Sequence, residues 1–498
     1  RQATRVEPSA ESARVFFLKH ASEYVTLDLF RVRQLPFLTR RNYYYEVLYL
    51  LPWGLLAGVV EANISAVVAA KTFGGDKLLI TVTTTTPVAA HLASLLWGAL
   101  CVGRRKLRVF TLAASGVCLF TATVGLAPAS EWGGWCFAAQ MAAAQFFMTG
   151  VVTAGSALWK FNYPVSVRGR ITARLQALRA VLGVVVLVLA SCLFDYDPGA
   201  YRFAYPAVAG LGALGILVLQ RIHVRGERKE LRRAVIPAGH GPDVGLVEPF
   251  SLTTLLSGGP VVARAIRILR TDAPFRKYCT AQSLAGMSNL MMPTVMVAIL
   301  ANELLTGIHH FYFVSIVLLD VLPRSLIMAS LPRWGRLFDR IGVVRFRIVN
   351  AVVWTASLAV GGLATLGVGY AERIGPAILP LAIAGFALRA ILQGVSMGGG
   401  NLAWYIGHLH FARPEEAEVY MGLHVSLTGL RGLIMPSVGI LLYTWIGWWV
   451  WGVAVIVNLL SLAGYASLAR DEVKRGQESS SAPGTLREVR GTHAERDS

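Results

Sequence analysis

Apolar stretches of about 20 residues recur along most of this chain, and they constrain its fold more than any other feature. A helix rises about 1.5 Å per residue, so a stretch of this length spans the hydrocarbon core of a bilayer. Hydrophobic residues make up 55% of the 498 positions and charged residues only 15%, which is more apolar than a soluble domain requires. Twelve candidate spans follow, near residues 45–72, 77–101, 108–128, 134–159, 171–194, 203–221, 280–303, 310–332, 346–370, 375–403, 418–444 and 447–468.

The net charge of +19 is spread between the apolar spans rather than gathered in one domain. Arginine and lysine concentrate in the even-numbered connections, a pattern that sets the topology of membrane insertion. These residues are Arg104, Arg105, Lys106, Arg108, Lys160, Arg168, Arg170, Arg333, Arg336, Arg340, Arg345 and Arg347. We therefore attribute the charge to topology, expect no nucleic-acid partner, and predict that both termini are cytoplasmic.

The spans divide the chain into two halves of six helices, at 43–221 and 277–470. Residues 1–42 are predicted to form a cytoplasmic N-terminal segment, and 222–276 a cytoplasmic linker. The tail at 471–498 is rich in Ser, Glu and Arg and has no apolar periodicity, which is typical of disorder.

Sequence matches between the two halves occur in the same order, which indicates an internal duplication. The segment WGRLFDRIG at 334–342 has a degraded copy, WGALCVGRRK, at 97–106. Further matches pair Pro36-Phe37 with Pro274-Phe275, Asn63 with Asn289, Trp159 with Trp404, and Arg179 with Arg431. Parallel repeats of six helices place a substrate site near the bilayer midplane, between the halves.

The segment GRLFDRIG at 335–342 fits the G-x-L-a-D-R-x-G loop of the major facilitator superfamily, and the chain resembles that family of transporters over 40–470. The resemblance implies an all-α membrane protein with twelve transmembrane helices in two pseudo-symmetric halves. In the first copy Val102 stands where the family has an acidic residue. A charge-based gate is therefore expected in the second copy only.

The gating loop implied by this resemblance consists of Gly335, Arg336, Asp339 and Arg340. Gly335 would let two helices approach, and Asp339 would accept hydrogen bonds from an arginine or a helix N-terminus. The alternative is a loop whose positive charge only orients the protein in the membrane.

Ionisable residues inside the spans are candidates for function, because a charge in hydrocarbon costs at least about 2.5 kcal/mol unless it is paired or faces a cavity. Six residues qualify: Glu61, Arg179, Asp320, Arg324, Arg389 and Arg431. Asp320 and Arg324 are spaced i, i+4 and could form a structural pair, although Pro323 between them could spoil its geometry. Asn63 points about 200° away from Glu61 and is interpreted as a packing residue.

Proton coupling is predicted through Glu61 or Asp320, because a buried carboxyl group can load and release a proton as its exposure changes. The alternative is a purely structural salt bridge for either residue. Arg389 could also be the partner of Glu61.

Arg179 and Arg431 occupy equivalent positions in the two halves, and a symmetric pair of guanidinium groups could clamp a carboxylate or phosphate. Alternatively, both could serve gating at the cytosolic entrance. The six charges sum to four positive and two negative, which favours an anionic solute. Polar residues that could orient such a solute are Asn289, Gln393, Ser396 and Asn401.

The function predicted from these features is secondary active transport of a small anionic organic solute, coupled to protons, by alternating access. The same fold could instead export drug-like compounds, carry sugars or exchange solutes without an ion, and a membrane receptor or membrane-embedded enzyme is the rival class. The glycine-rich segment at 394–400 lacks the Lys-Ser/Thr of a P-loop, so ATP is not the expected energy source. The sequence also has no H-E-x-x-H motif, no Gly-x-Ser-x-Gly in a strand-turn-helix context and no paired CxxC spacing, so we expect no enzyme activity, no cofactor and no metal. We expect a monomer in the cell membrane (the inner membrane in a bacterium), whose partners are the solute, the lipid bilayer and H⁺.

Overall fold

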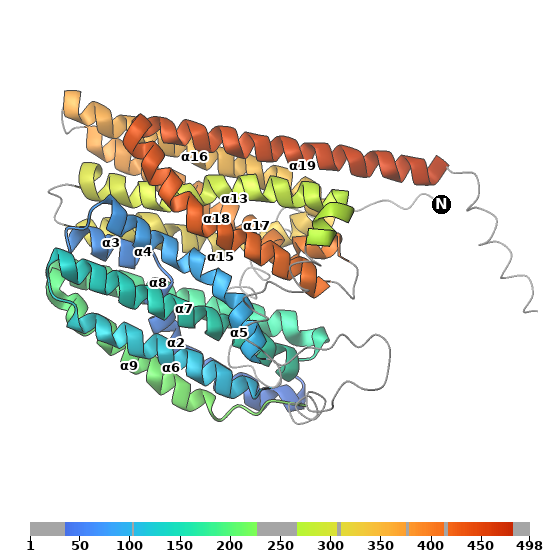
Figure 1. The fold of residues 1–498 in the computed structure, drawn as a ribbon, viewed down its shortest axis with the longest axis horizontal. Helices are drawn as coiled ribbons and strands as arrows, with labels where there is room; N and C mark the ends of the chain where they lie inside the picture. Colours follow the sequence, from blue (N-terminus) through green and yellow to red (C-terminus); the bar gives the residue numbers. More distant parts are fainter. Residues whose placement is uncertain are drawn as a thin grey trace, which may run out of the picture.

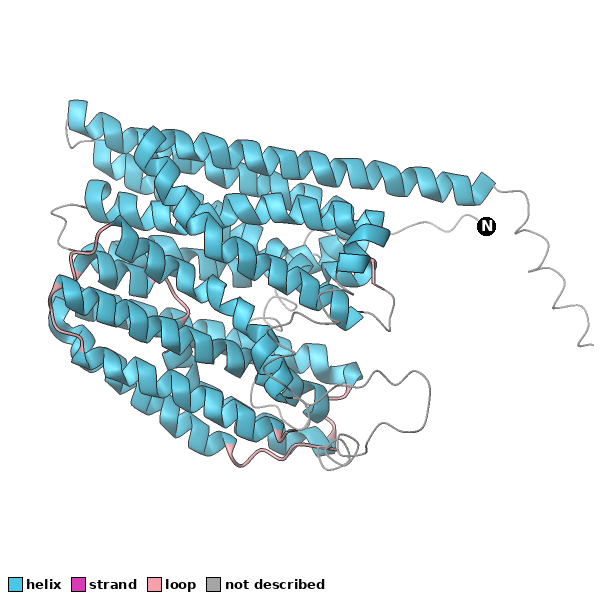
Figure 2. Ribbon diagram, in the orientation of Figure 1, coloured by secondary structure: helices cyan, strands magenta, loops and turns pink. Residues whose placement is uncertain are grey.

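The computed structural model describes residues 35–101, 104–226, 266–305, 310–374, 378–412 and 417–481. All regular secondary structure in these ranges is helical (Figure 2). The first half contains α2 (Phe37–Val60), α3 (Ile64–Lys71), α4 (Lys77–Ala89), η3 (Ala90–Ala93), α5 (Ser94–Cys101), α6 (Lys106–Thr123), α7 (Glu131–Asn162), α8 (Val165–Tyr196) and α9 (Tyr201–Leu219).

The second half contains α13 (Ala273–Ile299), η6 (Leu300–Leu304), α14 (Phe311–Ile316), η7 (Val317–Val321), α15 (Leu322–Ile341), α16 (Val343–Ile374), α17 (Leu379–Ile406), α18 (Ala417–Ile446) and α19 (Val450–Ser481). Figure 1 shows the two halves as two groups of helices, the first coloured blue to green and the second yellow to red.

Eight helical stretches in the described ranges are long and apolar enough to cross a membrane, and the bent pair of α2 and α3 makes a ninth. One of the eight, Leu423–Arg475, includes most of both α18 and α19. The predicted twelve spans are therefore not fully confirmed by this criterion. It omits α4, which has only 13 residues before the turn at η3, and α13, which begins with a basic and polar segment.

Some predicted boundaries differ from the structure. Helix α19 continues to Ser481, so the first part of the tail predicted to be disordered is helical. The rest of the tail, most of the predicted N-terminal segment, and 227–265 of the predicted linker lie outside the described residues.

The internal repeat predicted from the sequence has a three-dimensional counterpart around two tryptophans. Trp97 on α5 donates its indole N–H to the carbonyl of Phe146 on α7, at 3.0 Å. Trp334 on α15 donates to the carbonyl of Val395 on α17, at 2.7 Å. Four residues beyond each acceptor, Gly150 and Gly399 leave room for the indole ring: a Cβ there would lie 2.5 Å from Trp97 or 2.9 Å from Trp334.

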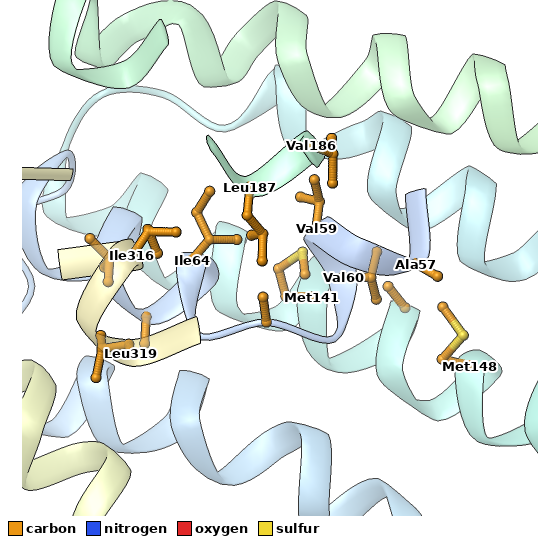
Figure 3. Close-up of a cluster of buried hydrophobic side chains, with 14 of the residues drawn as sticks. Ala57, Val59, Val60, Ile64, Met141, Met148, Val186, Leu187, Ile316 and Leu319 are labelled. Carbon is orange, nitrogen blue, oxygen red and sulfur yellow. The ribbon is translucent and has the colours of Figure 1, made fainter. Parts of the chain in front are cut away.

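The first span is broken where α2 ends and α3 begins, with a bend of 48° between the two helices. Figure 3 shows Val60 and Ile64 on the two sides of this break, near Leu187 of the first half and Ile316 and Leu319 of the second. These side chains are all at least 90% buried. Apolar side chains from both halves therefore pack against the break.

Hydrogen bonds between the halves, within the described residues, lie toward one end of the molecule and the middle of the spans. Asp195 at the end of α8 accepts from the backbone N–H groups of Tyr312 (2.8 Å) and Phe313 (3.0 Å), and the hydroxyls of Tyr312 and Thr72 are 2.8 Å apart. Lys77 donates to the hydroxyl of Thr444, at 3.2 Å. We call this the closed end. The opposite end, with the connections at 104–105, 163–164 and Gly342, is called the basic end.

Candidate functional site

Asp320 is the centre of a polar network that joins the two halves at the break in the first span. Its carboxylate accepts from the backbone N–H of Asn63 (3.0 Å), the Asn63 amide (3.3 Å) and Nε of Arg324 (3.4 Å). The side chain of Asp320 is only 5% exposed. Arg324 also donates to the backbone carbonyl of Glu61, at 3.3 Å.

The local backbone explains how this network forms. The break between α2 and α3 leaves the N–H of Asn63 outside regular helical bonding, so Asp320 can satisfy it. Asp320 lies in the π-helical turn η7, and Pro323 is in the first turn of α15, where proline is tolerated. Pro323 therefore does not disrupt the Asp320–Arg324 pair.

Glu61 and Arg179 form an ion pair within the first half, between the end of α2 and the middle of α8. Their side chains are 28% and 24% exposed. Arg389 is not the partner of Glu61: its guanidinium lies over the ring of Trp451, 5.5 Å from the centroid. Glu61, Arg179, Asp320 and Arg324 therefore neutralise one another in two pairs.

A small polar pocket of about 120 Å³ lies inside the second half, between α13, α16, α17 and α19. Its polar lining residues are Gln282, Asn289, Arg347, Asn350, Ser396, Asn401, Trp404, Asn458 and Tyr465. Gly286 also lines it, and a Cβ at this glycine would lie 2.8 Å from Nε of Arg431. Arg431 is therefore at the edge of the pocket.

Arg179 and Arg431 lie at the same depth in their helices. Each follows the first residue of its helix, Val165 or Ala417, by fourteen positions. Whereas Arg179 pairs with Glu61, Arg431 donates to the hydroxyls of Ser283 (2.9 Å) and Thr428 (2.8 Å). The predicted symmetric clamp is therefore not what the structure shows, because one of its two arginines already has a carboxylate partner.

The other candidates are distributed as follows. Asn289 and Asn401 line the pocket, whereas Gln393 does not, and its amide lies 3.9 Å from the sulfur of Met397. The matched asparagines, Asn63 and Asn289, are not at equivalent depths, since Asn63 follows the end of α2 and Asn289 lies within α13. The two asparagines belong to different polar sites.

The residues of the predicted gating loop lie on the last two turns of α15 rather than in a loop. The chain leaves the helix at Gly342, whose φ of +73° favours glycine. Gly335 is not at a close contact between helices, because a Cβ there would meet no described atom within 4 Å. Arg336, Asp339 and Arg340 are exposed, and within the described ranges Asp339 has no hydrogen bond or ion pair. Val102 of the first copy is outside those ranges.

Three important polar residues were missed from the sequence. Asn63 was interpreted as packing, but it bonds to Asp320 through both its backbone and its side chain. Arg347 was assigned to the positive connection, yet it is only 4% exposed. Its spacing from Asn350 and Trp354 places all three on one helix face, a signal that could have revealed it.

The third missed residue is Glu46 on α2, a carboxylate that is 8% exposed. It accepts hydrogen bonds from the indole N–H of Trp159 and the hydroxyl of Tyr163. Glu46 lies inside the first predicted span, 45–72, so a full count of ionisable residues within the spans is the signal that reveals it. Within the described residues, no group of three or more His, Cys, Asp or Glu could hold a metal ion.

No family model matches this sequence, and no curated protein matches it either. Its structure is similar to solved transporters. The nucleoside transporter NupG has 13% identity and a TM-score of 0.59, over 87% of this chain and 99% of that one. A POT family transporter in complex with 5-aminolevulinic acid has 13% identity and a TM-score of 0.59, over 85% and 96%. The xylose transporter XylE from E. coli, in an inward open conformation, has 12% identity and a TM-score of 0.56, over 84% and 95%.

These structures align with nearly their whole length, across both halves of the chain. The low identity makes the likeness one of fold. Together with the apolar helices, it confirms the predicted all-α architecture. The protein is a multi-pass membrane protein with the fold of the major facilitator superfamily transporters.

Proposed function

We propose that the protein is a secondary transporter that moves a small organic anion by alternating access, coupled to protons. The observation that carries the proposal is the network of Asp320, Asn63, Arg324 and Glu61 between the halves. In a carrier whose halves rock about a central site, contacts of this kind must break when the closed end opens. The positive-inside pattern predicts that the basic end is cytoplasmic and the closed end is outside, so this state would face the cytoplasm.

Asp320 is the preferred coupling residue. Its carboxylate is almost fully buried and accepts hydrogen bonds from both halves. Glu61 is partly exposed and is paired within its own half. Protonation of Asp320 would remove the charge that attracts Arg324 and one acceptor for Asn63. The closed end would then be easier to open, which links proton binding to the change of state.

The anionic character of the solute is supported by the charges left after pairing. Glu61 with Arg179 and Asp320 with Arg324 are neutral pairs. Arg389 packs on Trp451, and the hydrogen bonds of Arg431 within the described residues go to hydroxyl groups. The unpaired charges near the centre of the second half are therefore positive.

The experiment is solute-driven proton flux in proteoliposomes with trapped pyranine. We would add succinate, glucose 6-phosphate, uridine, glucose and tetraphenylphosphonium in turn. Proton movement with an anionic solute is expected in the wild type. Asp320→Asn should abolish it while sparing exchange of labelled solute, and Asp339→Asn should behave as the wild type because Asp339 is exposed and without a partner in the described ranges.

Solute exchange without proton movement in the wild type would refute coupling and leave an exchanger. Movement of only uridine, glucose or the phosphonium cation would refute the anionic solute. Absence of transport with every solute, in protein that is folded and inserted, would count against the carrier itself.

A further inference from the structure

Two buried arginines in the second half have no carboxylate partner among the residues that the structure describes. Arg347 on α16 is 4% exposed and Arg431 on α18 is 8% exposed. Within the described residues neither makes an ion pair. Their hydrogen bonds go to neutral hydroxyls: Arg347 to Tyr278 (3.4 Å), and Arg431 to Ser283 (2.9 Å) and Thr428 (2.8 Å).

Each of these guanidinium groups also keeps an unused donor. The Nε atoms of Arg347 and Arg431 are buried and have no hydrogen-bond partner in the described part of the chain. The two groups border the same pocket, since Arg347 lines it and Arg431 lies beside Gly286, which also lines it. Burying two like charges without a counter-charge is strongly unfavourable, so an anion near both would stabilise the arrangement.

The polar pocket of the second half provides the space for such an anion. Arg347 is part of its lining, and Gly286 lines it next to Arg431. Its volume of about 120 Å³ fits one small head group rather than a whole large solute. A larger residue at position 286 would occupy the space beside Arg431.

The pocket lining is suited to oxygen atoms that carry negative charge. Asn289, Asn401 and Gln282 contribute amides, which can donate hydrogen bonds. Among the described residues, the lining of the pocket contains no Asp or Glu. The four charges of the Asp320 network, Glu61, Arg179, Asp320 and Arg324, already form neutral pairs.

We propose that Arg347 and Arg431 together bind the anionic head group of the transported solute, a carboxylate or phosphate, in the pocket of the second half. This inference rests on the proposed transport function and deepens it, since it assigns the anion to one half instead of a clamp shared by Arg179 and Arg431. Guanidinium groups suit planar and tetrahedral oxyanions because their N–H donors form a fork. Substrate recognition would then belong to the second half, and the Asp320 network would couple it to movement.

The test is equilibrium binding to the purified full-length protein, measured by thermal shift without any gradient. Acetate, succinate and inorganic phosphate are titrated against chloride at matched ionic strength. A saturable increase in Tm with an oxyanion is expected for the wild type. Arg347→Gln and Arg431→Gln should each weaken the apparent affinity at least about thirtyfold.

The matched control is Arg345→Gln, which removes an exposed arginine two positions from Arg347 on the same helix. It should leave the titration unchanged. If Arg347→Gln does not fold, Gly286→Ala provides a second variant, because its Cβ would displace the Arg431 guanidinium while every charge is kept. Comparison of succinate with phosphate identifies which oxyanion the pocket prefers.

The outcomes separate this inference from the proposed function. If oxyanions stabilise the wild type and both Arg347→Gln and Arg431→Gln equally, the pocket assignment is overturned while anion transport stands. If no oxyanion stabilises the wild type, the anion site is overturned, and the proton-flux assay with neutral solutes still decides whether the protein is a carrier. Loss of binding in both variants but not in Arg345→Gln supports the pocket.

Discussion

The two halves share one fold but solve the same electrostatic problem in opposite ways. Arg179 in α8 and Arg431 in α18 lie at the same depth, yet Arg179 has a carboxylate partner within its half, whereas Arg431 bonds to hydroxyl groups alone within the described ranges. The charges of Glu61 and Arg179 near the centre of the first half are therefore paired, whereas the second half keeps an excess of positive charge. The two arginines have equivalent positions on the backbone but different partners. The unpaired arginine makes the second half the candidate binding site.

The largest effect should come from the residue that connects the halves. Asp320→Ala removes a buried carboxylate and leaves the partly buried Arg324 without its partner, and breaking a buried pair costs about 3–5 kcal/mol. We expect a clear fall in Tm or loss of folded protein in size-exclusion chromatography. Asp339→Ala is the control and should change stability by less than about 0.5 kcal/mol. Similar losses for both variants would show that the Asp320 network does not hold the halves together.

Substitution of each arginine tests whether Arg179 and Arg431 contribute differently to stability. Arg179→Gln should lower stability by about 1 kcal/mol, because it leaves Glu61 without its partner in a partly exposed position. The double variant with Glu61→Gln should recover much of this loss, as a double-mutant cycle in Tm would measure. Arg431→Gln should not destabilise the anion-free protein, since it removes an uncompensated charge. Equal losses for both single variants, with no rescue, would contradict the asymmetry.

The indole hydrogen bonds of Trp97 and Trp334 test whether the matching contacts of the two halves are equally stabilising. Trp97→Phe and Trp334→Phe each remove one indole hydrogen bond to a backbone carbonyl and keep most of the ring. Each should lower stability by about 1 kcal/mol, and the two effects should be nearly equal in thermal unfolding. A loss in only one half would show that the repeated geometry is not energetically equivalent.

The smallest effect concerns the glycines of the two signature segments. A Cβ at Gly98 or Gly335 would meet nothing within 4 Å, so alanine should be tolerated and could stabilise each helix by about 0.5–1 kcal/mol. Gly342→Ala should destabilise, because φ there is +73°. Thermal stability of the three variants gives the comparison. A large loss for Gly335→Ala would restore the interpretation of this residue as a point of close helix contact.

Much of the fold could be predicted because its determinants are local. The length and apolar character of each span are properties of consecutive residues, and the helix-to-helix order repeats in a sequence pattern that contains Trp97 and Trp334. The predicted pair of Asp320 and Arg324 is also local, since it needs only one turn of helix, and the structure contains it.

The candidate site was less predictable because its contacts join distant parts of the chain. Whether Arg179 or Arg389 reaches Glu61 depends on how α8 and α17 are placed around α2, which no local pattern encodes. The error at Asn63 has a similar origin: helical periodicity turned it away from Glu61, but the helix breaks at this point and the periodicity no longer applies.

By itself, the sequence determined that this is a multi-pass helical membrane protein built from a repeat, because compatibility with lipid and the order of matching segments can be read along the chain. Only the tertiary structure decided which charges are neutralised and which remain unpaired. Asn63 and Asp320 are 257 positions apart, and Arg347 is buried only because four helices of the second half surround it. The electrostatic energy of a buried charge depends on neighbours in space, and packing alone determines those neighbours.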